Sequence, residues 1–356
     1  MDRQSSVTIR HVARRAAVSI ATVSRALNTP KTVSNDVLSR VHEAIAELGY
    51  LPHSAARALA SNHFGVVGAV VPTLEIPIFA TAIQALQGRL NQHHYQLLVT
   101  STDCNPSLEY SRLEALLSKG VDGIVLVGAS HEPRVQRLLE AKKTPYVNTW
   151  VYDASAHCPS VGFDNKRAMV QVVRHLYDLG HRKFAMIAGL TAHNDRAFER
   201  VAGVLEALAE RGLVLAPRDL ILRPYTLTDG RSALGMLLEG SNVPTAVICG
   251  NDILALGALF EARERGIAVP KSLSITGFDD LELSSHTVPA LTTVHVPASE
   301  MGLKAADYLI AQISGAATLD RVEFEAPLIV RGTTAPPGEA CASGASGGRR
   351  GVLADA

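Results

Sequence analysis

The sequence predicts an α/β protein in which a small helical head precedes a larger body. Two observations predict this fold class. The first fifty residues contain three short helical patterns and no strand pattern. From Phe64 onward, short apolar runs alternate with helical patterns, as in parallel sheets that are covered by helices on both faces. The apolar runs fall into two similar sets, so we expect two lobes with a cleft between them.

The three head helices have recognisable ends. The first begins after Thr8, the second after Ser19 and the third after Ser34, and each of these residues is a favoured N-cap. Gly49 ends the third helix. Only the residues "AVS" separate the first two helices, which forces them to cross steeply. This is the geometry of a helix-turn-helix.

Residues 50–63, "YLPHSAARALASNH", form a linker with weak helical character. The segment is too short to be a stable helix in isolation. We expect it to become helical only when another surface holds it. At the other end of the chain, residues 336–356 are rich in Gly, Ala and Ser and contain no leucine heptad. This composition predicts a disordered tail.

The body alternates strands and helices in a regular order. We expect strands at 65–72, 95–101, 123–128, 145–150, 160–164, 183–189, 220–225, 245–251, 273–279 and 291–296, and helices between them, such as 165–180 and 252–266. In sheets of this kind, ligands bind beyond the carboxyl ends of the strands.

The charge is distributed unevenly along a neutral chain. The 356 residues contain 34 basic and 34 acidic side chains. Residues 1–60 contain eight basic and four acidic side chains, so this segment carries +4 and the remainder −4. A basic head on an acidic body is the pattern expected where only the head meets a polyanion.

Several classes of protein are disfavoured by the composition. The cysteines, Cys104, Cys158, Cys249 and Cys341, are scattered and form no CxxC pair. We therefore expect free thiols in a reducing compartment and no metal site. The N-terminus lacks an apolar signal region, and no apolar run approaches the ~18 residues of a membrane span. We expect a cytoplasmic protein without a cofactor.

The second head helix, residues 20–28, is the candidate for insertion into a DNA major groove. Arg25 suits a bidentate contact with guanine, whereas Ile20 and Ala21 offer only apolar contact. The hydroxyls that could donate to phosphates or bases belong to Ser19, Thr22 and Ser24. The alternative is a surface helix whose hydroxyls only cap and solubilise it.

The head and the following linker resemble the LacI/GalR family of bacterial transcription regulators. The core pattern VAxxAxVSxxTVSRxLN is matched at Val12, Ala13, Ala16, Val18, Ser19, Thr22, Val23, Ser24, Arg25, Leu27 and Asn28. The hinge pattern GYxPxxxARxL is matched at Gly49, Tyr50, Pro52, Ala56, Arg57 and Leu59. Body segments such as "PTAVICGNDILALGAL" and "SITGFDD" extend the resemblance over about residues 6–333.

The resemblance implies roles for individual head and hinge residues. Ile20 and Ala21 occupy the two variable positions that help to choose operator base pairs, and Arg25 a further base-reading position. Leu59 falls where the family inserts a leucine into the minor groove, an apolar wedge that kinks the duplex. By its spacing alone, Leu59 is a buried linker leucine. The candidate DNA-binding residues are Thr8, Ser19, Ile20, Ala21, Thr22, Ser24, Arg25, Asn28, Arg57 and Leu59.

For the body, the resemblance implies a fold like that of periplasmic sugar-binding proteins, with two lobes, three crossovers and a small effector between the lobes. The candidate effector-binding residues are Phe79, Trp150, Arg200, Tyr225, Asn251 and Asp279. Charged groups offer strong hydrogen bonds, and aromatic rings offer flat apolar faces. The residues alone leave alternatives: Arg200 could pair with Glu199 or Glu206, and both Phe79 and Tyr225 could belong to the core.

These observations give a domain plan for the whole chain. We expect the head at 1–50, the hinge segment at 51–62, the body at 63–335 and the tail at 336–356. Within the body, the first lobe is expected at about 63–162 and 292–320. The second lobe is expected at about 163–290 and 321–335.

The sequence therefore predicts a ligand-responsive DNA-binding regulator, a homodimeric repressor on a pseudo-palindromic operator. A sugar or sugar derivative is the expected effector, and a purine-like ligand is the alternative. An enzyme is disfavoured because the chain lacks GxSxG, P-loop, HExxH and helix-opening GxGxxG motifs. A secreted solute-binding protein would explain the body, but not the basic head.

Overall fold

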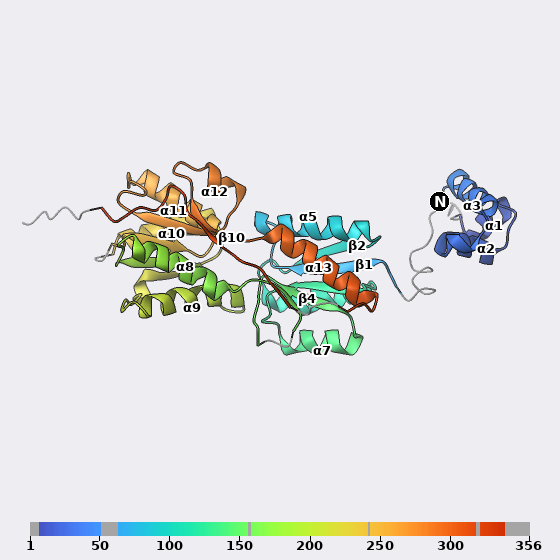
Figure 1. The fold of residues 1–356 in the computed structure, drawn as a ribbon, viewed down its shortest axis with the longest axis horizontal. Coiled ribbons are helices and arrows are strands. Elements are labelled where there is room, and N and C mark those ends of the chain that lie inside the picture. The colour runs from blue at the N-terminus through green and yellow to red at the C-terminus, as the bar shows by residue number, and fades with distance from the viewer. Residues whose placement is uncertain (1–6, 51–62, 156–157, 241–242, 318–320, 339–356) are drawn as a thin grey trace, which may run out of the picture.

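The computed structural model describes residues 7–50, 63–155, 158–240, 243–317 and 321–338 of the chain. It contains a three-helix head and a body with two six-stranded sheets (Figure 1). The predicted fold class, a helical head followed by two lobes with parallel sheets, is confirmed. The proposed hinge segment, 51–62, lies outside the described residues. No helix among the described residues is both long and apolar enough to cross a membrane.

The head is a small three-helix unit with its own apolar core. Its helices are α1 (Ile9–Arg15), α2 (Ile20–Asn28) and α3 (Asn35–Leu48), with a short 3-10 helix η1 (Pro30–Thr32) between the last two. Val12, Val23 and Val41 come from the three different helices and are fully buried together. Gly49 ends α3 in the left-handed conformation, with φ of 61°. The three helices begin and end close to where the sequence places them.

The joint between α1 and α2 is tight. Ala17 has a positive φ of 52°, and the amide of Val18 donates to the Ala13 carbonyl at 3.0 Å. Ser19 then caps α2, because its Oγ accepts a hydrogen bond from the Thr22 amide at 3.0 Å. The turn and the cap together fix the direction of α2 relative to α1, as a helix-turn-helix requires.

The first lobe is built on a parallel sheet with strand order β11-β5-β4-β3-β1-β2. Its strands are β1 (Val66–Val71), β2 (Gln96–Ser101), β3 (Gly123–Val127), β4 (Tyr146–Thr149), β5 (Ser160–Gly162) and β11 (Arg321–Glu323). Its helices are α5 (Pro77–Gln92), η2 (Pro106–Leu108), α6 (Glu109–Ser118), α7 (Pro133–Lys142) and α13 (Ala298–Ile313). The strand β3 is buried along its whole length, as expected for a central strand.

The second lobe repeats this plan with strand order β12-β10-β9-β8-β6-β7. Its strands are β6 (Phe184–Gly189), β7 (Leu220–Arg223), β8 (Ala246–Cys249), β9 (Ser274–Asp279), β10 (Thr292–His295) and β12 (Leu328–Ile329). Its helices are α8 (Asn165–Asp178), α9 (Asp195–Ala209), η3 (Pro217–Asp219), α10 (Leu227–Leu238), α11 (Asp252–Glu264) and α12 (Glu282–His286). Only the pair β10–β12 is antiparallel.

The chain passes between the lobes three times. It crosses after β5, after β10 and after β11, as the two sheet orders show. The lobe boundaries differ from the expected ones at two points. The strand β10 lies in the second sheet although 292–320 was expected in the first lobe, and β11 lies in the first sheet although 321–335 was expected in the second. Both strands lie next to a crossover, where an apolar pattern does not tell which sheet receives the strand.

In each lobe, one glycine allows two helices to pack closely against each other. In the first lobe, α13 packs along α5, and a Cβ on Gly302 would lie 2.3 Å from the carbonyl oxygen of Ala82. In the second lobe, a Cβ on Gly257 would lie 2.3 Å from the Leu227 carbonyl oxygen, at the contact of α10 with α11. In each case backbone, which cannot move aside cheaply, occupies the space.

We expect Gly302→Ala to lower the free energy of unfolding by about 1–3 kcal/mol, because the added methyl group overpacks the α5–α13 contact. The sign is decisive, since the same change in an open helix interior raises stability by roughly 0.5–1 kcal/mol. Urea unfolding followed by far-UV circular dichroism measures the effect. Lys304→Ala, on the exposed side of α13, is the matched control. A stabilised Gly302→Ala variant would contradict the packing argument.

Candidate functional site

Five of the six residues predicted to bind an effector lie after the carboxyl end of a strand, and the sixth, Asp279, ends one. In the first lobe, Phe79 lies in the first turn of α5 after β1, and Trp150 directly follows β4. In the second lobe, Arg200 lies on α9 after β6, Tyr225 follows β7, Asn251 follows β8, and Asp279 is the last residue of β9. This is the edge of a parallel sheet where ligands bind.

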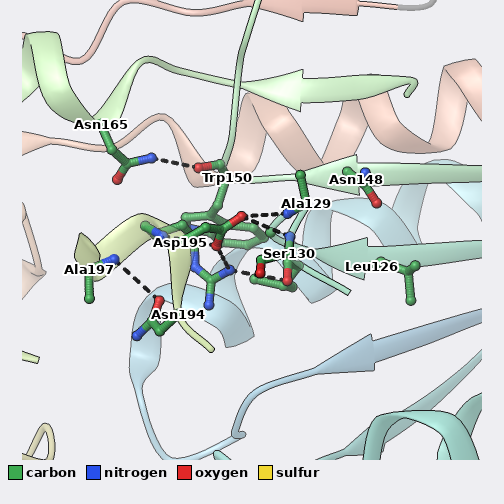
Figure 2. Close-up of polar contacts among 12 residues, drawn as sticks. Leu126, Ala129, Ser130, Asn148, Trp150, Asn165, Asn194, Asp195 and Ala197 are labelled. Carbon is green, nitrogen blue, oxygen red and sulfur yellow. Dashed lines mark hydrogen bonds and ion pairs between the residues drawn. The ribbon is translucent and has the colours of Figure 1, made fainter. Parts of the chain in front are cut away.

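Trp150 joins the aromatic wall of the first lobe to the second lobe. Its ring lies against Phe79, with centroids 5.0 Å apart. Its backbone has a positive φ of 64°, and its carbonyl oxygen accepts a hydrogen bond from Nδ2 of Asn165 at 2.8 Å (Figure 2). Asn165 is the first residue of α8, just past the first crossover. A side chain of the second lobe therefore holds the backbone of Trp150, the only tryptophan of the chain.

Arg200 is a buried cation with defined partners. Only 6% of the residue is exposed. Its Nε donates to Oδ1 of Asn165 at 2.9 Å, and its Nη1 donates to the Gly250 carbonyl at 2.8 Å. The guanidinium lies 3.6 Å from the ring centroid of Phe278. Burial lowers the pKa of Arg200, and the nearby charge of Asp279 opposes this shift.

The alternative pairing of Arg200 with an acidic neighbour on its own helix does not occur. Neither Glu199 nor Glu206 is among the partners of its guanidinium, and Glu206 pairs instead with Lys166 of α8. Arg200 therefore points away from the helix surface, toward Asn165 and the carboxyl ends of β8 and β9.

Asp279 is the strained and buried acid of the site. It is 5% exposed and has φ of 117°, and the following Asp280 has φ of 56°. Two successive residues in this region of conformational space are a source of backbone strain, which clusters at functional sites. Burial raises the pKa of Asp279 to about 8, although the positive charge of Arg200 lowers it.

Tyr225 and Asn251 complete the second-lobe wall. A Cβ on Gly189 would lie 2.1 Å from Oη of Tyr225, so the glycine at the end of β6 makes room for the phenol. Burial raises the pKa of Tyr225, while Arg200 opposes the shift. Oδ1 of Asn251 caps α11 by accepting from the Leu254 amide at 2.9 Å. This cap leaves the two side-chain N–H donors of Asn251 for another partner.

A second buried acid, Asp252, holds the strand ends in place. Its carboxylate accepts hydrogen bonds from the Leu281 amide at 2.8 Å and from the hydroxyls of Ser284 and Thr293 at 2.6 Å each. Burial raises its pKa to about 6, and these hydrogen bonds lower it. Asp252 thereby ties α11, the start of α12 and β10 together around the end of β9.

Three further residues of the cleft were missed by sequence reasoning. They are Asn165, Asp195 and Arg196. The carboxylate of Asp195, at the start of α9, accepts hydrogen bonds from the backbone amides of Ala129 and Ser130 in the other lobe (Figure 2). All three residues begin a helix that follows a strand or a crossover, and that position is the signal by which they could have been found.

The candidate DNA-binding face of the head is the exposed side of α2. Ser19, Ala21 and Arg25 are exposed, and Ile20 is 45% exposed. Val23, on the opposite side, is buried in the head core. Thr8 is also exposed, and its amide donates to Nδ1 of His11 at 3.1 Å. Arg57, Leu59 and the side chain of Asn28 lie outside what the structure describes.

The hydroxyls of Ser19 and Thr22 are 2.8 Å apart. If the Thr22 hydroxyl donates, both lone pairs of the Ser19 oxygen are used, one by this hydroxyl and one by the Thr22 amide. The Ser19 hydroxyl proton is then directed outward. One hydroxyl thus caps the helix and keeps a donor for an acceptor such as a phosphate oxygen.

Both parts of the chain match known families. Residues 8–53 match the family described as "Bacterial regulatory proteins, lacI family". Residues 64–331 match "Periplasmic binding proteins and sugar binding domain of LacI family".

Individual relatives show the same likeness. The HTH-type transcriptional repressor CytR of Escherichia coli (strain K12) is 32% identical over 335 residues, which cover 93% of this chain and 97% of the relative. A crystal structure of the lac repressor dimer bound to operator and the anti-inducer ONPF has a TM-score of 0.83 and 27% identity, and covers 93% of this chain and 100% of that chain. A complex of the transcriptional regulator CelR with cellobiose has a TM-score of 0.68 and 28% identity, and covers 92% and 99%. These proteins are transcriptional regulators and not enzymes.

We expect Asp279→Asn to remove a pH-dependent loss of stability. The folded-state pKa of Asp279, about 8, is above its ordinary value of 3.8. The stability linked to its protonated form is therefore fully present below pH 3.8 and is lost as the pH rises through about 8. Thermal melts from pH 5 to 9 should show the variant gaining about 4 kcal/mol on the wild type as the pH rises, because each pH unit between 5 and the folded-state pKa contributes about 1.4 kcal/mol.

Glu282→Gln, an exposed acid of the same lobe, is the control for this measurement. A constant difference between Asp279→Asn and the wild type across this range would show that Asp279 is ionised throughout and would contradict the assignment.

Proposed function

The chain belongs to the lacI family of bacterial regulatory proteins, and from this we propose that it is a ligand-responsive transcriptional repressor. Its two heads bind a pseudo-palindromic operator as a dimer in the cytoplasm. A small metabolite in the cleft between the lobes controls the affinity for the operator. Residues 1–50 form the DNA-binding head, 51–62 the hinge segment and 63–335 the ligand-binding body.

The observation that carries this proposal is the buried Arg200 with Asp279 beside it, in a chain that also has a helix-turn-helix head. Arg200 has five N–H donors, and two acceptors of the protein occupy its Nε and Nη1. The pKa of Asp279 is shifted by burial and by neighbouring charges, and hydrogen bonds are not among the causes. A donor and an acceptor at the end of a sheet, facing an aromatic wall, suit a small polar ligand.

The proposed ligand is a sugar or a sugar derivative. Hydroxyl groups both donate and accept, so they match the guanidinium of Arg200, the amide of Asn251 and the carboxyl of Asp279. The C–H face of a sugar ring fits the aromatic surfaces of Phe79 and Trp150. The similarity to the CelR–cellobiose complex supports this class. A purine-like ligand, which would stack on the same rings, is the alternative that a ligand screen separates.

On the DNA, we propose that α2 enters the major groove. Arg25 reads a guanine, while Ile20 and Ala21 select base pairs by shape and methyl contact because they cannot hydrogen-bond. Leu59 is proposed as the minor-groove wedge. Thr8, Ser19, Thr22, Ser24, Asn28 and Arg57 are proposed to contact phosphates or bases.

We propose a homodimer, which exposed apolar side chains support. Phe260 on α11 is 45% exposed and Leu283 on α12 is 56% exposed. A two-fold dimer would cover such groups and present two heads to two half-sites. We propose that ligand binding changes the closure of the lobes and shifts operator affinity through a coupling of ~1–3 kcal/mol.

We expect Arg25→Ala to weaken specific operator binding by ~1–3 kcal/mol and to leave non-specific DNA binding nearly unchanged. The lost contact is a bidentate one to a base edge and not to a phosphate. Fluorescence anisotropy with operator and scrambled duplexes at fixed salt measures both affinities. Arg218→Ala, an exposed arginine of the body, is the control. Equal losses on the two duplexes would contradict the base-reading role.

We expect a thermal-shift screen of sugars, sugar derivatives and purines to reveal a ligand that Asp279→Ala no longer binds. The variant should keep operator affinity within twofold of the wild type and lose the response to the ligand. An unchanged ligand-induced shift in Asp279→Ala would place the ligand elsewhere. Loss of operator binding by the wild type under all conditions would contradict the proposed function itself.

A further inference from the structure

We propose that Asp195 and Arg196 form a clasp that holds the two lobes together across the cleft. Each contact of the clasp joins a group of one lobe to a backbone group of the other. The clasp deepens the proposed function, because lobe closure is the step through which the body is proposed to control the head.

Asp195 supplies the first half of the clasp. Its Oδ2 accepts hydrogen bonds from the amides of Ala129 at 2.6 Å and Ser130 at 3.1 Å (Figure 2). Asp195 is the first residue of α9 in the second lobe, whereas Ala129 and Ser130 follow β3 in the first lobe. A carboxylate that accepts two backbone N–H groups forms charge-assisted bonds, which are stronger than bonds between neutral groups.

Arg196 supplies the second half of the clasp. Its Nη1 donates to the Val127 carbonyl of the first lobe at 3.1 Å and to Oδ1 of Asp195 at 2.8 Å. The bond to Val127 places the guanidinium on the side of α9 that faces the first lobe. Asp195 thus accepts from two backbone N–H groups of the first lobe, and Arg196 donates to a backbone carbonyl beside them.

The receiving loop is shaped for these two side chains. Gly128 has φ of 88°, which favours glycine. A Cβ at this position would lie 2.1 Å from Nη1 of Arg196 and 2.7 Å from Oδ1 of Asp195. The clasp therefore occupies the space that any other residue at position 128 would fill.

His131 holds the receiving loop from inside the first lobe. Its Nδ1 lies 2.7 Å from the Glu109 carboxylate, and its Nε2 lies 3.1 Å from the Gly128 carbonyl and 3.2 Å from Oδ1 of Asn148. The imidazole is almost completely buried. Because the loop is anchored to its own lobe, it cannot follow α9 when the lobes separate. Opening must break the bonds to Asp195 and Arg196.

The single tryptophan of the chain reports on this contact. Trp150 is 5% exposed and belongs to an apolar cluster that also contains Phe278 and Leu281 of the second lobe. If the clasp opens, water and quenchers reach the indole ring. Its fluorescence therefore measures closure of the lobes in the full-length protein, without ligand and without DNA.

We expect Asp195→Ala to raise the acrylamide quenching constant of Trp150 at least twofold and to shift its emission to longer wavelength. Arg196→Ala should act in the same direction, and it leaves the first-turn acid of α9 in place. The matched control is Asp229→Ala, which removes a first-turn acid from α10 in the same lobe. Asp229 accepts its hydrogen bond from Thr226 of its own helix start and makes no bond to the first lobe.

The clasp would be overturned if Asp195→Ala and Arg196→Ala both had the same quenching constant as Asp229→Ala. The comparison requires that all three proteins keep the wild-type circular dichroism spectrum. Operator affinity is measured separately on the same variants. A more accessible Trp150 with an at least threefold change in operator affinity supports the clasp and its coupling to DNA. A more accessible Trp150 with unchanged operator affinity confirms the clasp and contradicts the proposed control of DNA binding by lobe closure.

Discussion

One buried cation, Arg200, organises the residues at the strand ends of the second lobe. Removing a guanidinium from water is costly unless acceptors surround it. Asn165, the Gly250 carbonyl and the face of Phe278 surround it here. The Asn165 amide bonds at the same time to the Trp150 carbonyl. The Asn165 side chain thus stabilises Arg200 of the second lobe and also holds Trp150 of the first lobe. The geometry of the site and the relation of the lobes are therefore linked.

Strain and desolvation are concentrated where the strands end. Trp150, Asp279 and Asp280 all have positive φ values, and Asp279 is a buried acid. None of these features stabilises the fold, since an ordinary residue in an ordinary conformation would cost less. At Asp279 and Asp280 the strained backbone persists because the buried Asp252 holds the adjoining segment. Backbone strain and buried charge of this kind cluster at functional sites, where the surrounding structure maintains them.

The sequence predicts the repeating parts of the fold and few of the contacts between lobes. The ten strands and the head helices follow from local apolar patterns and caps. The strands β11 and β12, with three and two residues, are too short to show a period. Of the predicted effector residues, Phe79 and Arg200 lie on the helices that follow strands, and the other four lie at or just after strand ends. Asn165, Asp195 and Arg196 act through residues 15 to 69 positions away, and a local pattern carries no information about such partners.

The apolar tip of α2 has a physical consequence for how the head discriminates between DNA sequences. Ile20 is largely exposed at the start of the helix, where a polar residue would interact better with water. Ser19 and Thr22, the neighbouring hydroxyls, bond to each other and to the helix backbone. When Thr22 donates to Ser19, the Ser19 hydroxyl proton is the one donor that this pair keeps for an outside acceptor. We therefore propose that discrimination at this turn comes mainly from the apolar fit of Ile20 and Ala21, which favours thymine methyl groups over bulkier or more polar edges.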